Sequence, residues 1–126
     1  MSQPLKTSFV EKLRAQTEQA EEENRYFGFD RQENGRALMF ELRTRDGRRY
    51  ALPYSYVTRA EFDPDKGIEI YVSNVIVQVS GRSLCIIFSY FLQNRLTWIR
   101  EDAAGMDTEE DEVFVNGIEI KERAEL

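Results

Sequence analysis

The sequence predicts an α+β protein, and three patterns carry that prediction. Apolar and polar residues alternate between residues 36 and 80, which indicates β-strands. From residue 83 to 100 the apolar residues recur at helical spacing, which indicates one amphipathic helix. Hydrophobic residues make up 41% of the chain and charged residues 32%, which is typical of a folded domain. We expect about five strands in one curved, largely antiparallel sheet, with a small barrel as a variant, covered by the long C-terminal helix.

The composition divides the chain into four segments. Residues 1–35 are expected to form an N-terminal helical extension, with its helix over 7–24. Residues 36–100 are expected to form the core domain of sheet and helix, and residues 101–112 an acidic linker. Residues 113–126 then form a C-terminal hairpin or strand.

The first two strands are predicted to meet through a three-residue loop, Arg45-Asp46-Gly47. A two-residue turn would place the apolar residues of the two strands on opposite faces of the hairpin. The three-residue loop places Leu42 opposite Tyr50 and Phe40 opposite Leu52, so all four share one face. Gly47 is then left-handed, in a bulge.

Three more strands are predicted further along the chain. Pro53 indicates a bend, and the next strand runs from about residue 56 to 62. After a turn at 63–67, two strands form a hairpin around Ser73-Asn74, which pairs Val72 with Val75 and places six apolar residues on one face.

The helix over 83–100 is predicted to cover this apolar face. Register and helical phase together predict a core formed by Phe40, Leu42, Leu52, Ile70, Val77, Phe88 and Leu92. The helix carries more apolar surface than one sheet face needs, because Ile86, Tyr90 and Trp98 lie on a flank about 100° away. Either the N-terminal segment or another chain is expected to cover this flank, with Tyr26, Phe27 and Phe29 as possible anchors.

The tail, Val113 to Ile120, is predicted to form a hairpin around Asn116-Gly117, because Asn-Gly suits a type I′ turn. The alternative is a single strand with a bulge at Gly117. Either form is expected to dock on a sheet edge, of its own domain or of another copy. The candidate interaction surface therefore consists of the helix flank and the apolar residues of the tail: Ile86, Tyr90, Trp98, Val113, Val115, Ile118 and Ile120.

Catalytic and metal chemistry find little support in the sequence. The chain has no histidine and only one cysteine, which removes histidine-based nucleophile pairs, histidine metal ligands and intramolecular disulfides. Asp63, Asp65 and Glu69 lack the further oxygen ligands of a calcium loop and are better explained by a turn. We therefore expect no cofactor and no bound metal, and a protein that is not an enzyme.

The net charge of −6 is unevenly distributed. Residues 36–59 hold six arginines and two acids, net +4, whereas residues 101–126 hold ten acids and two bases, net −8. A nucleic-acid surface on the sheet is thus an alternative interpretation of five arginines: Arg43, Arg45, Arg48, Arg49 and Arg59. Pairing of these arginines with Glu41, Glu61 and Glu69 is favoured, because the protein as a whole is acidic.

The leading functional hypothesis is a cytoplasmic, non-catalytic protein-interaction module that self-associates or binds another protein. No apolar run is long enough to span a membrane, and no signal-peptide core is present. A nucleic-acid-binding sheet domain is the second hypothesis, although nucleic acid is not the favoured partner. A small ligand-binding protein or enzyme that uses carboxylates and tyrosines is the third.

Overall fold

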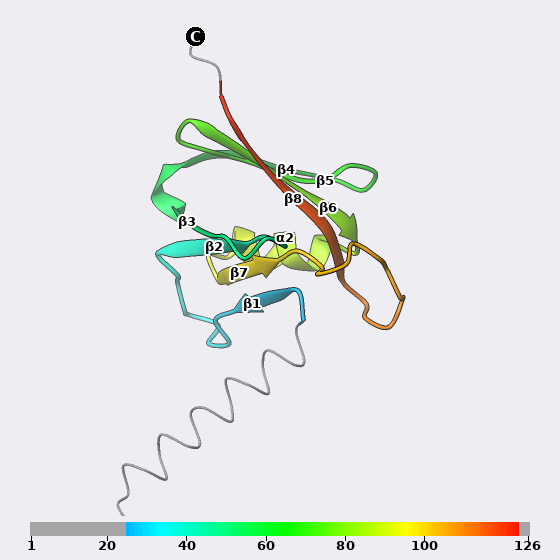
Figure 1. Cartoon of the computed structure of the whole chain (residues 1–126). Coiled ribbons are helices and arrows are strands. Elements are labelled where there is room, and N and C mark those ends of the chain that lie inside the picture. The colour runs from blue at the N-terminus through cyan, green and yellow to red at the C-terminus, as the bar shows by residue number, and fades with distance from the viewer. Residues whose placement is uncertain (1–24, 124–126) are drawn as a thin grey trace, which may run out of the picture.

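The computed structural model describes residues 25–123, which form two four-stranded sheets (Figure 1). The first sheet has the strand order β1-β7-β2-β3 and the second β4-β5-β6-β8. The elements are β1 (Phe27–Phe29), β2 (Met39–Arg43), β3 (Arg49–Pro53), the 3-10 turn η1 (Tyr54–Tyr56), β4 (Val57–Asp63), β5 (Gly67–Val72), β6 (Val75–Arg82), α2 (Cys85–Leu92), β7 (Leu96–Arg100) and β8 (Phe114–Glu122).

The fold is mainly β, so the predicted α+β architecture with a single sheet is wrong. The second sheet is antiparallel throughout, whereas the first is mixed because β2 and β7 run parallel. The two sheets do not close into a barrel. The helix predicted over 7–24 lies outside the described residues.

The local strand pairings are those that the alternation predicted. In the first hairpin Leu42 pairs with Tyr50 and Phe40 with Leu52. The Thr44 N–H donates to the Arg48 carbonyl at 2.9 Å, and Gly47 has a φ of 89°, which is the left-handed conformation expected for the three-residue loop.

The β5–β6 hairpin also has the predicted register, with Val72 opposite Val75 and Ile70 opposite Val77. Alternation determines the register here because a slip of one residue would move the apolar residues to the solvent face.

The predicted strands divide between two sheets because the chain turns sharply after β3. Pro53 ends that strand and η1 follows, after which β4 begins the second sheet. Tyr54 holds the turn in place: its ring lies 5.0 Å from that of Phe40, and its hydroxyl donates to the Leu96 carbonyl at 2.7 Å. The bend predicted at Pro53 is therefore the point where one layer ends and the other begins.

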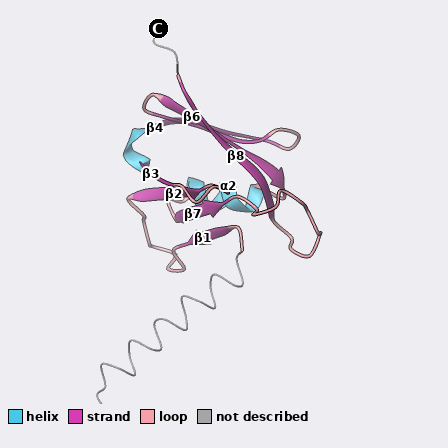
Figure 2. Ribbon diagram, in the orientation of Figure 1, coloured by secondary structure: helices cyan, strands magenta, loops and turns pink. Residues whose placement is uncertain are grey.

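The long helix predicted over 83–100 is wrong. The helix α2 ends at Leu92, Asn94 has a φ of 57°, and the rest of the segment is β7 (Figure 2). Asparagine tolerates the left-handed conformation that stops a helix. β7 then pairs with β1 on one side and β2 on the other, so its backbone groups bond to both neighbours.

The core lies between the sheets, and α2 contacts both of them. The ring of Phe91 lies 5.4 Å from that of Phe40 in β2, and the ring of Phe88 lies 5.9 Å from that of Phe62 in β4. Of the predicted core, Phe40, Leu42, Ile70 and Val77 are buried, while Leu52 and Phe88 are partly buried. Leu92 is 64% exposed, because the helix ends there, and its place in the predicted core is wrong.

The tail forms one long strand, so the predicted hairpin is wrong and the single-strand alternative holds. β8 pairs antiparallel with β6, from Arg82 opposite Phe114 to Val75 opposite Glu122. The register shifts where Ser80 faces Gly117 and Gly81 faces Val115, so the bulged residue is Asn116, one position before the predicted one. Within residues 25–123, no helix has the length and apolar character needed to cross a membrane.

Candidate functional site

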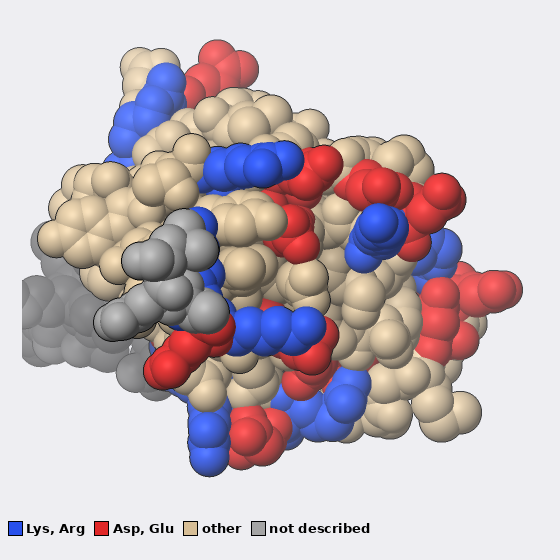
Figure 3. Space-filling view, turned by 90° about the horizontal axis from the view of Figure 1, so that it is seen from above, with Lys and Arg blue, Asp and Glu red and all other residues tan. Residues whose placement is uncertain are grey.

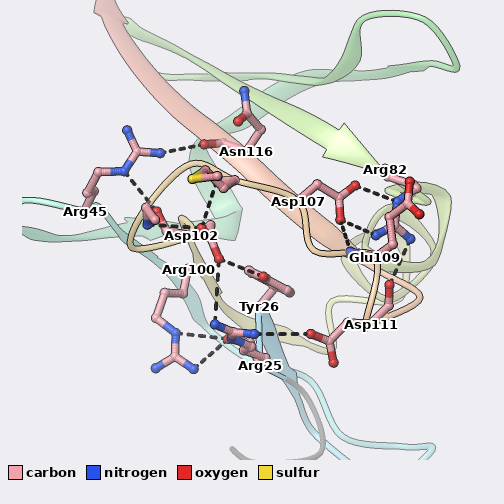
Figure 4. A network of polar contacts seen from close by, with 12 residues as sticks. Arg25, Tyr26, Arg45, Arg82, Arg100, Asp102, Asp107, Glu109, Asp111 and Asn116 are labelled. Carbon is pink, nitrogen blue, oxygen red and sulfur yellow. Dashed lines mark hydrogen bonds and ion pairs between the residues drawn. The ribbon is translucent and has the colours of Figure 1, made fainter.

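Arg82 attaches the acidic loop that precedes β8, residues 101–113, to the second sheet (Figure 4). Arg82, at the end of β6, forms two hydrogen bonds to the Asp107 carboxylate at 2.7 and 2.9 Å. It also donates to the carbonyls of Asp111 and Glu112, at 2.8 and 2.6 Å. The segment predicted as an acidic linker is thus attached to the second sheet, because a guanidinium matches both the carboxylate and the carbonyls.

Asp102 is the buried centre of this network, with 6% of its surface exposed. Its carboxylate accepts hydrogen bonds from the Tyr26 hydroxyl at 2.8 Å and from the backbone N–H groups of Ala104 and Met106. Burial favours the protonated form, but these hydrogen bonds outweigh it and hold the pKa of Asp102 below its ordinary value.

The pKa of the Tyr26 phenol shifts in the opposite direction. Burial, then the hydrogen bond to Asp102, raises the pKa of Tyr26 to about 12. At neutral pH the pair is a phenol that donates to a carboxylate, with no proton poised to transfer. The pair joins β1 to the acidic loop and is structural in character.

The titration of Tyr26 gives a testable consequence at high pH. An unfolded tyrosine ionises near pH 10, and the folded one near 12, so the folded state holds the proton more tightly. The stability that this adds is present below about pH 10 and is lost as the pH rises through about 12. Between pH 9 and pH 11, the free energy of unfolding measured in urea should fall more for the wild type than for Tyr26→Phe. Equal losses in the two proteins would contradict this assignment.

Arg45 and Glu101 connect the end of the first sheet to β8. Arg45 donates to the carbonyls of Asp102 and Asn116, at 2.9 and 2.8 Å. The Glu101 carboxylate accepts from the Arg45 N–H at 2.7 Å and from the Ile118 N–H at 2.8 Å. The Asp102 N–H donates to the Val115 carbonyl at 2.9 Å. From Val115 to the N–H of Ile118, the outer side of β8 is therefore occupied by its own chain.

Beyond that point no group of residues 25–123 pairs with the outer side of β8. Because the Ile118 N–H points away from β6 and neighbours along a strand alternate, the backbone groups of Ile120 and Glu122 point outward as well. The Arg123 N–H points inward, to the Asn74 carbonyl at 2.6 Å, which agrees with this alternation. No group within residues 25–123 bonds to the outward N–H and carbonyl groups of Ile120 and Glu122. We call the outer side of β8 from Ile118 to Glu122 the open edge.

A hollow of about 410 Å³ lies beside the open edge. Its walls come from the β2–β3 loop, the start of β3, Glu101 and β8. The lining is part apolar and part polar: Thr44, Arg45, Asp46, Tyr50, Glu101, Ile118 and Ile120.

The apolar tail residues predicted as an interaction surface lie mostly inside the core. Val113, Val115 and Ile118 are buried, and Ile120 is partly buried against the core. What β8 can offer to a partner is therefore its backbone at the open edge.

The predicted helix flank is divided by the end of α2. Tyr90 stacks on Phe29 with ring centroids 4.0 Å apart, and Ile86 packs partly buried against the core. The N-terminal segment thus covers this part of the flank, through the anchors that the sequence indicated. Trp98 lies instead on β7, and the guanidinium groups of Arg43 and Arg100 lie 4.5 and 5.1 Å from its ring centroid.

The arginines predicted as an alternative nucleic-acid surface are engaged with their own chain. Arg43 and Arg49 both bond to Glu41, at 2.6 and 2.8 Å. Burial raises the pKa of Glu41, but the bonds from these two guanidinium groups outweigh burial and lower it. The others also have acceptors: Arg48 pairs with Asp46, Arg59 with Glu61, and Arg45 with the carbonyls named above.

The outer face of the second sheet carries a hollow of about 530 Å³. Figure 3 shows the molecule from the side of this sheet, where acidic and basic side chains lie next to one another. Glu69 on this face accepts hydrogen bonds from Tyr71 and Gln78, both at 2.8 Å, and among the described residues these are its partners rather than the predicted arginine. Within the described part of the chain, no group of three or more acidic or cysteine side chains is arranged to hold a metal ion.

Comparison with known proteins adds no assignment: no family model, no curated protein and no solved structure matches this chain.

Proposed function

We propose that this protein is a non-catalytic protein-interaction module that binds an extended strand along the open edge of β8. The observation that carries the proposal is the set of outward backbone groups at Ile120 and Glu122, which have no partner within residues 25–123. An unpaired strand edge is a template for a further strand, and peptide-binding domains use such edges.

Two features of the surroundings support this use of the edge. The hollow beside it leaves room for a chain, and Tyr50, Ile118 and Ile120 give that room an apolar side. The network of Arg45, Glu101 and Asp102 occupies only the first half of β8, so it sets where an added strand would begin.

Nucleic-acid binding is not proposed, because each of the five candidate arginines already has an acceptor in its own chain. A phosphate would have to displace these acceptors.

The proposal is tested by selection of peptides and by hydrogen exchange. A displayed library of random extended peptides would be selected on the wild type, on Ile120→Pro and on Ile120→Val. Proline removes the outward N–H without removing a bond to β6, whereas valine keeps the backbone intact. We expect peptides that bind the wild type and Ile120→Val but lose at least about tenfold in affinity for Ile120→Pro.

Bound peptide, or a second copy of the chain, should slow hydrogen exchange of the Ile120 and Glu122 amides. This readout uses the wild type and does not depend on the folding of Ile120→Pro. If neither selected peptides nor high protein concentration slows exchange at these amides, the proposed function is wrong.

A further inference from the structure

The open edge is short and carries charge, which restricts what can pair with it. Glu119 and Lys121 are exposed on the outer face of β8, with their charged groups 3.8 Å apart. Charged side chains on an edge strand oppose pairing unless opposite charges meet across the strands. The sequence of the added strand is therefore constrained to place a base opposite Glu119 and an acid opposite Lys121.

β8 itself meets this requirement. We propose that the strand added at the open edge is β8 of a second copy, antiparallel and centred on Ile120, so that two second sheets join across a two-fold axis. The inference rests on the proposed function and names its partner.

The backbone groups match in this register. Ile120 would exchange both of its outward hydrogen bonds with the partner's Ile120, since residues that face each other in this way form a hydrogen-bonded pair. The Glu122 N–H would donate to the carbonyl of the partner's Ile118. The N–H of Ile118 already donates to the Glu101 carboxylate, so the new hydrogen-bond ladder ends at Ile118.

The charges match in the same register. Antiparallel pairing about Ile120 places Glu119 directly opposite the partner's Lys121, and the two-fold axis repeats the pair. A register centred on Glu119 would oppose two glutamates, and one centred on Lys121 would oppose two lysines. Like charges directly opposite each other destabilise a sheet, so the register on Ile120 is the favoured one.

The other face of the joined strands is apolar at its centre, and the same register places Glu122 opposite the partner's Ile118 at each end. Ile120 packs on the core side of β8 and lines the hollow with Tyr50 and Ile118. The partner's Ile120 would lie against it there. The two-fold contact is thus apolar at the centre of one face and ion-paired on the other face.

The experiment uses the full chain and sedimentation equilibrium at low salt, with the variants Glu119→Lys, Lys121→Glu and the double exchange of both residues. Glu110→Lys is the control, because it makes the same charge change at an exposed position of the acidic loop. We expect the wild type and Glu110→Lys to dimerise, and each edge variant to raise the dimer Kd by at least about tenfold. The double exchange should restore the Kd to within a few fold, because each pair is re-formed with its charges reversed.

Mixing the two single variants provides a second readout. Each repels its own copy, but together they place lysines opposite glutamates, so a heterodimer should form when both are present. The folded state of every variant is checked by thermal unfolding, and a variant that forms the heterodimer has folded.

The inference is overturned if the wild type stays a monomer at every accessible concentration, or if it dimerises and the double exchange is no tighter than the single variants. A monomeric wild type whose Ile120 and Glu122 amides are protected by a selected peptide leaves the proposed function standing. If no peptide protects them either, both proposals fail.

Discussion

Replacement of Phe40 by alanine should lower the free energy of unfolding by about 3–5 kcal/mol. The Phe40 side chain is 1% exposed and contacts the rings of Tyr54 and Phe91, so it joins the first sheet, the turn η1 and the helix α2. Its loss would leave a cavity where these three elements meet. Equilibrium unfolding in urea measures the change.

Leu92→Ala is the matched control for this variant, since both residues belong to the core predicted from the sequence. Because Leu92 is mostly exposed at the end of α2, its truncation should change the free energy of unfolding by less than about 0.5 kcal/mol. A loss at Leu92 as large as that at Phe40 would mean that the helix continues and that the two-sheet arrangement is incorrect.

Replacement of Asp102 by alanine should cost about 2–4 kcal/mol of stability. The variant would leave the Tyr26 hydroxyl without its acceptor in a buried place, and the N–H groups of Ala104 and Met106 would lose theirs as well. The acidic loop would also lose its buried attachment point, and exchange of amides in residues 103–112 should become faster. Glu110→Ala, an exposed acid in the same loop, should have little effect on either measurement.

The cost of Asp102→Ala should depend on pH. The folded pKa of Asp102 lies below the unfolded value, so its contribution is present above about pH 4 and is lost as the pH falls through the folded pKa. The unfolding free energies of wild type and variant should therefore converge in acid. If the difference between the two unfolding free energies stays constant from pH 7 down to acid unfolding, the network does not depend on the charge of the Asp102 carboxylate.

Local pairing could be predicted from the sequence because it depends on neighbours. The alternation of Phe40 and Leu42 with polar residues, and the position of Gly47, determine how β2 meets β3. The same reasoning determined the β5–β6 hairpin. Pairing of the arginines with Glu41 and Glu61 was also predicted, but across strands. Arg49 reaches Glu41 from the neighbouring strand, whereas Arg43 and Arg59 pair with the glutamate two residues away on their own strand.

The candidate site was only partly predictable. A strand in the tail and a bulge near Gly117 were visible as one alternative, but Asn116-Gly117 suits a turn as well as a bulge. The hydrogen bond between Tyr26 and Asp102 spans 76 positions, and no local pattern indicates it. The acidic run near Asp107 predicts a solvated linker, because its attachment to Arg82 arises only once β6 and the loop are side by side.

The sequence alone was enough to predict the strands from β2 to β6, the registers of the β2–β3 and β5–β6 hairpins and the bend at Pro53, because alternation and turn chemistry act within a few residues. Tertiary structure decided the rest. Leu96 and Ile99 have the spacing of a helix, but as part of β7 they are buried and their backbone bonds to strands on both sides. The hairpin and the single strand of the tail compete in the same way, and pairing with the whole of β6 favours the strand. Because the polar cap of Arg45, Glu101 and Asp102 reaches only as far as Ile118, the remainder of β8 is left as the open edge.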